Sequence, residues 1–393
     1  MQILNNVFTG LYDWINNLFA KVLPGWATWL VMNLGVMIVL ILFGVVGMLW
    51  WTYMERKVVA RIADRLGPNR AGPLGILVAV ADAIKMLTKE DITPSNADKG
   101  MFLAAPILIL IPAVLLYAVV PFGKGMIAAD LNIGILYVMA LGSITLMAML
   151  MAGWGSNNKY ALLGGFRAVA QLVAYEIPMA LSILAVVLLS GTLSTYGIVL
   201  KQSGVPFALV VPAAFIVYFL CGLAEVGRSP FDLVEADSEI VAGYNIEYSG
   251  MKFAMYYISE YFNLFTISAM ITTLFLGGWQ WPILPSYLWF LIKCFCVIFV
   301  MMWIRGTWPR FRIDQMLGFS WKVLVPVSLA NLFFVGLVIK LVTSPLPQTI
   351  ILLGGNVVII LVTLGLMGRA ARRHEERVTS LASQGLRLAP SEE

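Results

Sequence analysis

The stretch RSPFDLVEADSEIVAGYNIEY, residues 228–248, gathers carboxylates between two strongly apolar parts of the chain. It holds five of the protein's 21 acidic residues. Acids crowded together in a partly apolar setting titrate as a coupled set rather than one by one. Such a set can store and pass protons, which is the chemistry this stretch could perform. The five acids are Asp232, Glu235, Asp237, Glu239 and Glu247.

Ser229 and Pro230 predict a helix start within the stretch, with Ser as the N-cap and Pro in the first helical position. On that helix, Asp232, Glu235 and Glu239 are spaced three and four apart and share a face. Two plainer interpretations remain open. Asp232 could serve only as a cap, and a run of acids is usually a solvated surface. The apolar residues between the acids favour a partly buried segment over that surface.

Four more ionisable residues interrupt apolar segments elsewhere. An ionisable group inside a bilayer costs about 2.5–3.5 kcal/mol on insertion scales, so each is expected to have a function. Glu176 and Glu225 lie near segment ends, where snorkelling to water is an alternative explanation. Glu260 and Lys293 lie deeper, and Lys293 could also be a buried ion-pair partner.

The first long polar segment, residues 55–99, mixes both signs of charge around an apolar face. GPNRAGP breaks the preceding helix, and apolar residues at three- and four-residue spacing over 74–87 predict an amphipathic interfacial helix. The basic residues alone could simply hold this loop on one side of the membrane. The accompanying acids favour a charged rim at the mouth of a chamber for an amphiphile with a polar head. The basic residues in question are Arg56 and Lys57, and the acids are Glu55, Asp82 and Glu90.

Ligands for a redox centre are missing from the sequence. Cys221, Cys294 and Cys296 lie in apolar segments without a CxxC pair, and His374 is the only histidine. No P-loop or GxGxxG pattern occurs. The chain is therefore expected to hold no metal, haem or iron–sulfur cluster, and any electrons would come from another subunit.

Uncharged runs identify the elements that must position these residues. The chain is 60% hydrophobic and 12% charged, and its uncharged runs match the ~20 residues that a helix needs to cross a bilayer. The sequence thus predicts an all-α polytopic membrane protein with about nine transmembrane helices. They are placed near 27–53, 100–122, 133–155, 170–191, 205–227, 255–277, 286–305, 322–343 and 348–368.

Basic residues predict the orientation. With the N-terminus outside, 21 of the 26 Lys and Arg residues fall on the cytoplasmic side. The predicted layout is an N-terminal interfacial helix in 1–25, an eight-helix bundle over 26–343, an extra helix at 344–368 and a charged cytoplasmic tail at 369–393. The cytoplasmic loops of the bundle are 55–99, 156–169, 228–254 and 306–321.

Four long segments together resemble one family. RSPFDLVEADSEIVAGYNIEYSGMKFAMYYISEY is similar to the signature of the quinone-chamber membrane subunit of respiratory complex I, called subunit 1 in mitochondria and the H-type subunit in bacteria. ERKVVARIADRLGPNRAGPLGILVAVADAIKMLTKED, SNNKYALLGGFRAVAQLVAYEIP and IRGTWPRFRIDQ resemble its other cytoplasmic segments, in the same order. The resemblance covers roughly residues 27–343.

The resemblance implies a subunit of a proton-translocating NADH:quinone oxidoreductase in the bacterial plasma membrane. Quinone would be its substrate, and its partners would be hydrophilic iron–sulfur subunits and other membrane-arm subunits. By their place in the matching motifs, Glu55, Arg56 and Arg61 correspond to the family's quinone-tunnel entrance. Asp82, Lys85 and Glu90 correspond to the loop after it. The residues that match its acidic proton path or nearby charged positions are Glu176, Glu225, Arg228, Asp232, Glu235, Asp237, Glu239, Glu247, Glu260, Lys293, Arg305, Arg310 and Asp314.

The chain departs from the family pattern in two places. The common PFDLPEAE form has Pro and Glu where this chain has Val234 and Asp237, and the predicted ninth helix exceeds the usual eight. Two alternatives stay open: the charge-coupling membrane subunit of an energy-converting hydrogenase or ferredoxin-dependent relative, and a stand-alone ion transporter. The full-length first polar loop argues against a hydrogenase subunit. A transporter should show inverted repeats, and none is evident.

Overall fold

The computed structural model describes residues 7–232, 243–281, 283–342 and 344–383. Within these ranges the chain is helical and contains no β-strand. Seven helices are long and apolar enough to cross a membrane, which confirms an all-α polytopic membrane protein. They are α3 (Gly25–Ile62), α5 (Lys99–Leu115), α6 (Gly134–Gly155), α7 (Lys159–Ser190), α13 (Ser286–Thr307), the continuous pair α14 (Ile313–Phe319) and α15 (Val325–Leu341), and α16 (Pro345–Ser383).

Two further helices lie within the bundle, α10 (Pro212–Glu225) and α12 (Gly250–Leu274). All nine predicted segments are therefore helical. The count of nine membrane crossings stays a prediction, because α10 is short and α12 is more polar than the other seven.

Local sequence explains where several helices begin and end. The side chain of Asp98 accepts a hydrogen bond from the Gly100 N–H at the start of α5, and Asn158 does the same for Tyr160 at the start of α7. Helix α7 ends at Gly191, whose φ of 68° lies in the left-handed region that favours glycine. Asn158 and Gly191 thus mark the two ends of α7, the helix that carries Glu176.

The predicted continuous helix over 205–227 is wrong. Helix α9 (Phe207–Val210) stops at Val211, whose φ of −128° and ψ of 66° are not helical, and α10 starts at Pro212. Proline has no N–H to donate to the preceding turn, so it starts a new helix here instead of continuing the old one. The carboxyl end of α10 carries Glu225 toward the polar side of the bundle.

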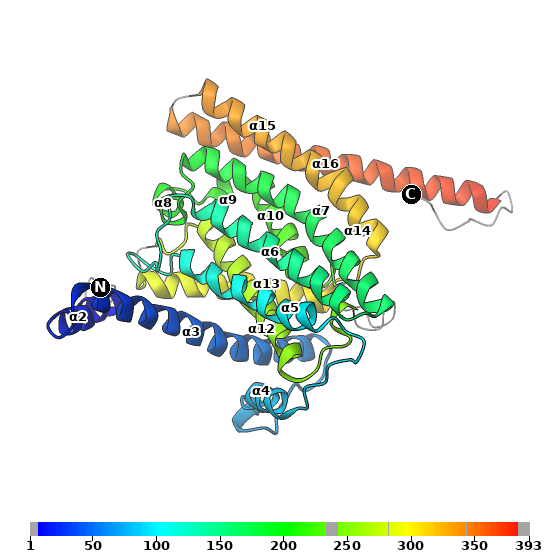
Figure 1. The fold of residues 1–393 in the computed structure, drawn as a ribbon. Coiled ribbons are helices and arrows are strands. Elements are labelled where there is room, and N and C mark those ends of the chain that lie inside the picture. The colour runs from blue at the N-terminus through cyan, green and yellow to red at the C-terminus, as the bar shows by residue number, and fades with distance from the viewer. Residues whose placement is uncertain (1–6, 233–242, 282, 343, 384–393) are drawn as a thin grey trace.

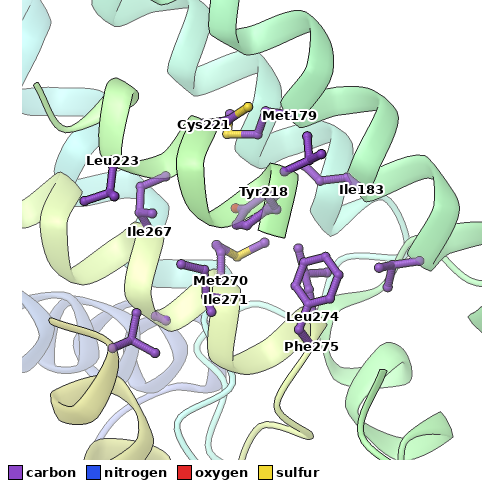
Figure 2. Packing of buried hydrophobic residues seen from close by; sticks show 14 of the residues in the cluster. Met179, Ile183, Tyr218, Cys221, Leu223, Ile267, Met270, Ile271, Leu274 and Phe275 are labelled. Carbon is purple, nitrogen blue, oxygen red and sulfur yellow. The ribbon is translucent and has the colours of Figure 1, made fainter. Parts of the chain in front are cut away.

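Helix α12 is the centre of the bundle. Seventeen of its residues are buried, and it packs against α3, α5, α10 and α13. Figure 2 shows Met270 and Ile271 of α12, and Phe275 directly after the helix, near Tyr218 of α10. A Cβ added at Gly222 would lie 2.6 Å from Ile267, so glycine is what lets α10 approach α12 this closely.

Smaller helices flank the first long helix. Helix α2 (Val7–Ala20) lies at one end of α3, and α4 (Val78–Thr88) lies at the other, as Figure 1 shows. Both were predicted as amphipathic helices, and both are helical. Their location at the membrane surface stays a prediction. Helix α16 packs against α15, α10 and α9 and continues well past the bundle.

Candidate functional site

A cavity of about 860 Å³ lies between α3, α4, α12 and α13. Its volume falls within the range of pockets that hold a drug-sized molecule. Most of its wall is apolar, from residues such as Val45, Met48, Ala79, Met86 and Ile258. The charged residues of the wall are Glu55, Arg56, Arg65, Asp82, Lys85, Arg228, Glu260 and Arg305.

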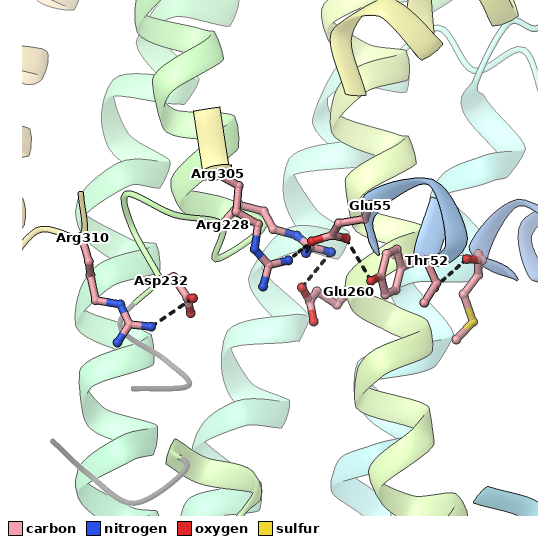
Figure 3. A network of polar contacts seen from close by, with 9 residues as sticks. Thr52, Glu55, Arg228, Asp232, Glu260, Arg305 and Arg310 are labelled. Carbon is pink, nitrogen blue, oxygen red and sulfur yellow. Dashed lines mark hydrogen bonds and ion pairs between the residues drawn. The ribbon is translucent and has the colours of Figure 1, made fainter. Parts of the chain in front are cut away.

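A buried charged cluster forms one part of this wall (Figure 3). Glu55 of α3 pairs with both Arg228, just after α10, and Arg305 of α13. Tyr261 of α12 donates a hydrogen bond to Glu55 Oε2 over 3.0 Å. Arg228 Nη2 also lies 3.0 Å from Glu260 Oε1. We call these five residues the Glu55 cluster.

Charge balance explains how the Glu55 cluster can be buried. Glu55 and Arg228 are each only 5% exposed, and an isolated charge at such a position would be very costly. Two guanidinium groups face two carboxylates, so the cluster is neutral as a whole. The Arg228 guanidinium also lies 4.9 Å from the centre of the Tyr261 ring, a cation–π contact.

A second charged group lies on the rim of the cavity and is centred on Asp82 of α4, a helix outside the membrane-spanning set. Arg56 and Lys85 contact the Asp82 carboxylate at 2.7 and 3.0 Å and so join α4 to the end of α3. Burial raises the pKa of Asp82, but hydrogen bonds and positive charge from Lys85 and Arg56 lower it by more. The resulting pKa lies below the ordinary value of 3.8.

We expect Asp82→Asn to loosen α4 by less than about 1 kcal/mol, because the pair is partly exposed and screened by solvent. A lowered pKa means that the pair stabilises the fold above the unfolded value of 3.8 and is lost as pH falls through the folded pKa. The difference between variant and parent should be the same at pH 8 and pH 5. Amide exchange over residues 78–88 measures it, and a difference that shrinks between those two pH values would contradict the assignment.

A smaller cavity of about 60 Å³ adjoins the Glu55 cluster. Glu260 and Arg305 line both cavities. The small one is also lined by Glu225, Tyr244 and Tyr256, among others, and has room for a few water molecules. Oxygen Oε2 of Glu225 is buried there and has no hydrogen-bond partner within the part of the chain that the structure describes.

The line of acids continues beyond the small cavity. Glu225 interacts electrostatically with Glu176 of α7. The Ser143 hydroxyl on α6 donates a hydrogen bond to Glu176 Oε1 over 2.8 Å. The structure therefore brings Glu55, Glu260, Glu225 and Glu176 into one series that crosses four helices.

Asp232 lines the small cavity and pairs with Arg310 at 3.1 Å. The predicted helix start at Ser229 is wrong, because residues 229–231 form a turn and a bend. The buried side chain of Gln171 donates hydrogen bonds to the carbonyls of Ala224 and Phe231, which holds this segment against α7. This tertiary contact outweighs the local preference of Ser-Pro for a helix start.

Other predicted residues lie apart from the Glu55 cluster. Glu247 accepts a hydrogen bond from Asn158, and Lys293 donates three to the carbonyls of Leu276, Gly278 and Gln280 in the turn after α12. Arg61, Glu90 and Asp314 are exposed and line neither cavity. Glu235, Asp237 and Glu239 lie outside the described residues.

Sequence reasoning missed the tyrosines of the site. Tyr261 contacts both Glu55 and Arg228, and Tyr244 and Tyr256 line the small cavity. The signal available was the position of Tyr261 directly beside Glu260 in a segment with several other aromatic residues. Over the described residues, no group of His, Cys, Asp and Glu side chains could hold a metal ion.

Comparison with known proteins identifies the family. Residues 34–336 match the NADH dehydrogenase family. The chain is 50% identical over 321 residues to the H-type subunit of the NADH-quinone oxidoreductase of Dehalococcoides mccartyi strain CBDB1, an alignment that covers 81% of this chain and 90% of the relative. It belongs to this H-type subunit family.

Two further relatives carry the same description. The H-type subunit of Carboxydothermus hydrogenoformans is 47% identical over 81% of this chain and 96% of its own length. The first of two H-type subunits of Geobacter sulfurreducens is 44% identical over 77% of this chain and 94% of its own length. The chain is thus a multi-pass membrane subunit of a bacterial NADH-quinone oxidoreductase, as its sequence predicted. The family match leaves α2 and α16 outside.

Proposed function

We propose that this subunit forms the quinone-binding chamber of its complex and the first part of the acidic path that couples quinone reduction to proton pumping. The observation that carries the proposal is the pair Glu260 and Arg305, which line the large cavity and the small cavity at once. A charge change in the large cavity would act directly on groups of the small one. The chain itself would hold no redox centre.

The large cavity suits a quinone. An isoprenoid quinone combines a long apolar tail with a polar head that bears two carbonyl oxygens. The apolar wall can accommodate the tail, and the arginines of the wall, Arg56 and Arg305 among them, carry N–H donors for the head. Iron–sulfur subunits of the complex, docked over the charged rim at α4, would supply the electrons.

The acids supply the coupling. Reduction of a quinone to a quinol consumes protons and changes the charge beside the Glu55 cluster. In response to that change, Glu260 would exchange a proton with Glu225 through the small cavity. Glu225 would in turn exchange a proton with Glu176. The carboxylates of Glu235, Asp237 and Glu239 would belong to the same path. We place the N-terminus outside the bacterial plasma membrane and the rim on the cytoplasmic side.

Two alanines on α4 test the chamber. Ala83 lines the large cavity, whereas Ala81, on the same short helix and also exposed, does not. Ala83→Trp should raise the KM for quinone by roughly tenfold, the cost of losing about 1.4 kcal/mol of binding, because the indole occupies the cavity. Ala81→Trp is the matched control and should leave the KM unchanged.

The assay uses the purified complex with NADH and then with reduced ferredoxin as electron donor. The proposal is supported if NADH drives quinone reduction and the KM for quinone rises in Ala83→Trp but not in Ala81→Trp. Quinone reduction with reduced ferredoxin but not with NADH would mean that the complex uses a different electron donor. The proposed quinone chamber would still stand. Hydrogen evolution without quinone reduction would instead indicate a hydrogenase-type subunit. Equal KM values in the two variants would refute a quinone site in this cavity.

A further inference from the structure

Helix α16 lies beyond the part of the chain that matches the family, yet it is built into the bundle. It packs against α15, α10 and α9, and a Cβ at Gly355 would collide with the Phe334 ring of α15. Glycine at 355 therefore lets the two helices approach closely. Figure 1 shows α15 and α16 crossing at one edge of the bundle.

One polar side chain of α16 reaches α10. Asn356 is fully buried, and its Oδ1 accepts a hydrogen bond from the backbone N–H of Ala213 over 3.2 Å. Its Nδ2 donates to the Leu352 carbonyl of its own helix over 2.9 Å, which fixes the orientation of the amide. Both polar ends of the side chain are thus used.

The Ala213 N–H needs a partner from elsewhere. It is the first N–H of α10, because the helix begins with Pro212, and the residue in the N-cap position is Val211, whose side chain cannot accept. Asn356 lies about 16 Å along α16 from its start at Pro345, well inside an apolar layer of about 30 Å. An unpaired N–H at that depth is costly, since no water is present to replace the lost bond.

We propose that Asn356 is a positioning residue, which caps α10 from a neighbouring helix and thereby holds Glu225, at the other end of α10, in register with the small cavity. The inference rests on the proposed function, because Glu225 matters for coupling only if it belongs to the proton path. In this proposal, α16 holds α10 in position for coupling and is more than an added lipid-facing helix. A chain with this helix would depend on it for coupling.

Amide exchange tests the cap without reference to activity. In the assembled complex, the Ala213 amide should exchange slowly, and Asn356→Leu should speed its exchange by roughly fivefold. Asn356→Asp retains an acceptor oxygen and should stay close to the parent. Thr363→Val is the matched control on α16, since it removes only a bond to the Ile359 carbonyl of the same helix. Rapid exchange at Ala213 in the unaltered complex would overturn the cap even if no variant folds.

Proton pumping per quinone reduced tests the positioning role. Asn356→Leu should lower this ratio by roughly twofold or more, while Asn356→Asp and Thr363→Val keep it. Faster exchange with an unchanged ratio would overturn the positioning role. Glu225→Gln, measured in parallel, separates the two proposals. If it loses pumping and Asn356→Leu does not, only the inference fails, and if Glu225→Gln pumps normally, the acid path itself fails.

Discussion

Arg228→Gln should destabilise the protein by about 3–5 kcal/mol and abolish most quinone reduction, because it removes a buried positive charge from the buried Glu55 carboxylate and from the partly exposed Glu260 carboxylate. Arg228 is 5% exposed and pairs with two acids from two helices. Glutamine can replace a hydrogen bond but not the positive charge. Thermal unfolding of the complex and its quinone reductase rate measure the two effects.

Arg310→Gln is the stability control for this prediction. Arg310 also pairs with one carboxylate, that of Asp232, but its side chain is 38% exposed. Its loss should therefore cost less than about 1 kcal/mol. Equal destabilisation by the two variants would show that burial does not increase the contribution of Arg228 to stability.

A double variant separates charge balance from chemistry. Arg228→Gln combined with Glu260→Gln leaves Glu55 paired with Arg305 and removes the uncompensated carboxylate. Stability should return in part, while quinone reduction coupled to pumping should not return. Recovery of both would mean that Arg228 and Glu260 only balance each other and take no part in the reaction.

The positions of the helices followed from the sequence because lipid imposes long uncharged runs. The break at Val211 did not follow, although Pro212 marks it, because proline is tolerated within other helices of this bundle. Helix α5 contains Pro106 and Pro112 without ending at either. Helix α9 ends because the backbone of Val211 is not helical. The first N–H of the next helix, that of Ala213, then donates to Asn356, which lies far away in the sequence.

The pairings within the site could not be predicted. Glu55 and Arg228 are 173 residues apart, and they meet only because α3 and α10 both pack against α12. The sequence placed Glu55 with the tunnel entrance and Arg228 with the acidic path. The structure brings them into one cluster. The residue types carried the chemistry, but the contact that joins the two proposed functions depends on helix packing.

Lys293, in contrast, lies away from the Glu55 cluster. A lysine inside an apolar helix suggested an ion-pair partner or a member of the proton path. Its ammonium group instead has three carbonyl oxygens of the turn after α12 within 3.0 Å. It lies about 18 Å from Arg305 along α13, at the far end of the helix from the Glu55 cluster. Nothing in the local sequence distinguishes a carbonyl-bound lysine from a carboxylate-bound one.

Glu225 lies in the middle of the acid series, so it tests the proposed proton path most directly. Among the described residues, its buried Oε2 has no hydrogen-bond partner, and the small cavity beside it has room for water. It lies between Glu260, which shares its small cavity, and Glu176, with which it interacts electrostatically. In the proposed path, the Glu225 carboxyl group passes protons between these two acids.

Glu225→Gln should therefore leave the complex assembled and at least as stable, but lower proton pumping by roughly tenfold or more, the typical contribution of a positioned acid or base. Glutamine has the same shape and cannot release a proton. Proteoliposomes with a pH-sensitive dye measure pumping, and electron transfer from NADH to an artificial acceptor should stay normal. Glu90→Gln, on an exposed residue that lines neither cavity, is the control. Parent-like pumping in Glu225→Gln would exclude Glu225 from the path and leave Glu260 without its acceptor.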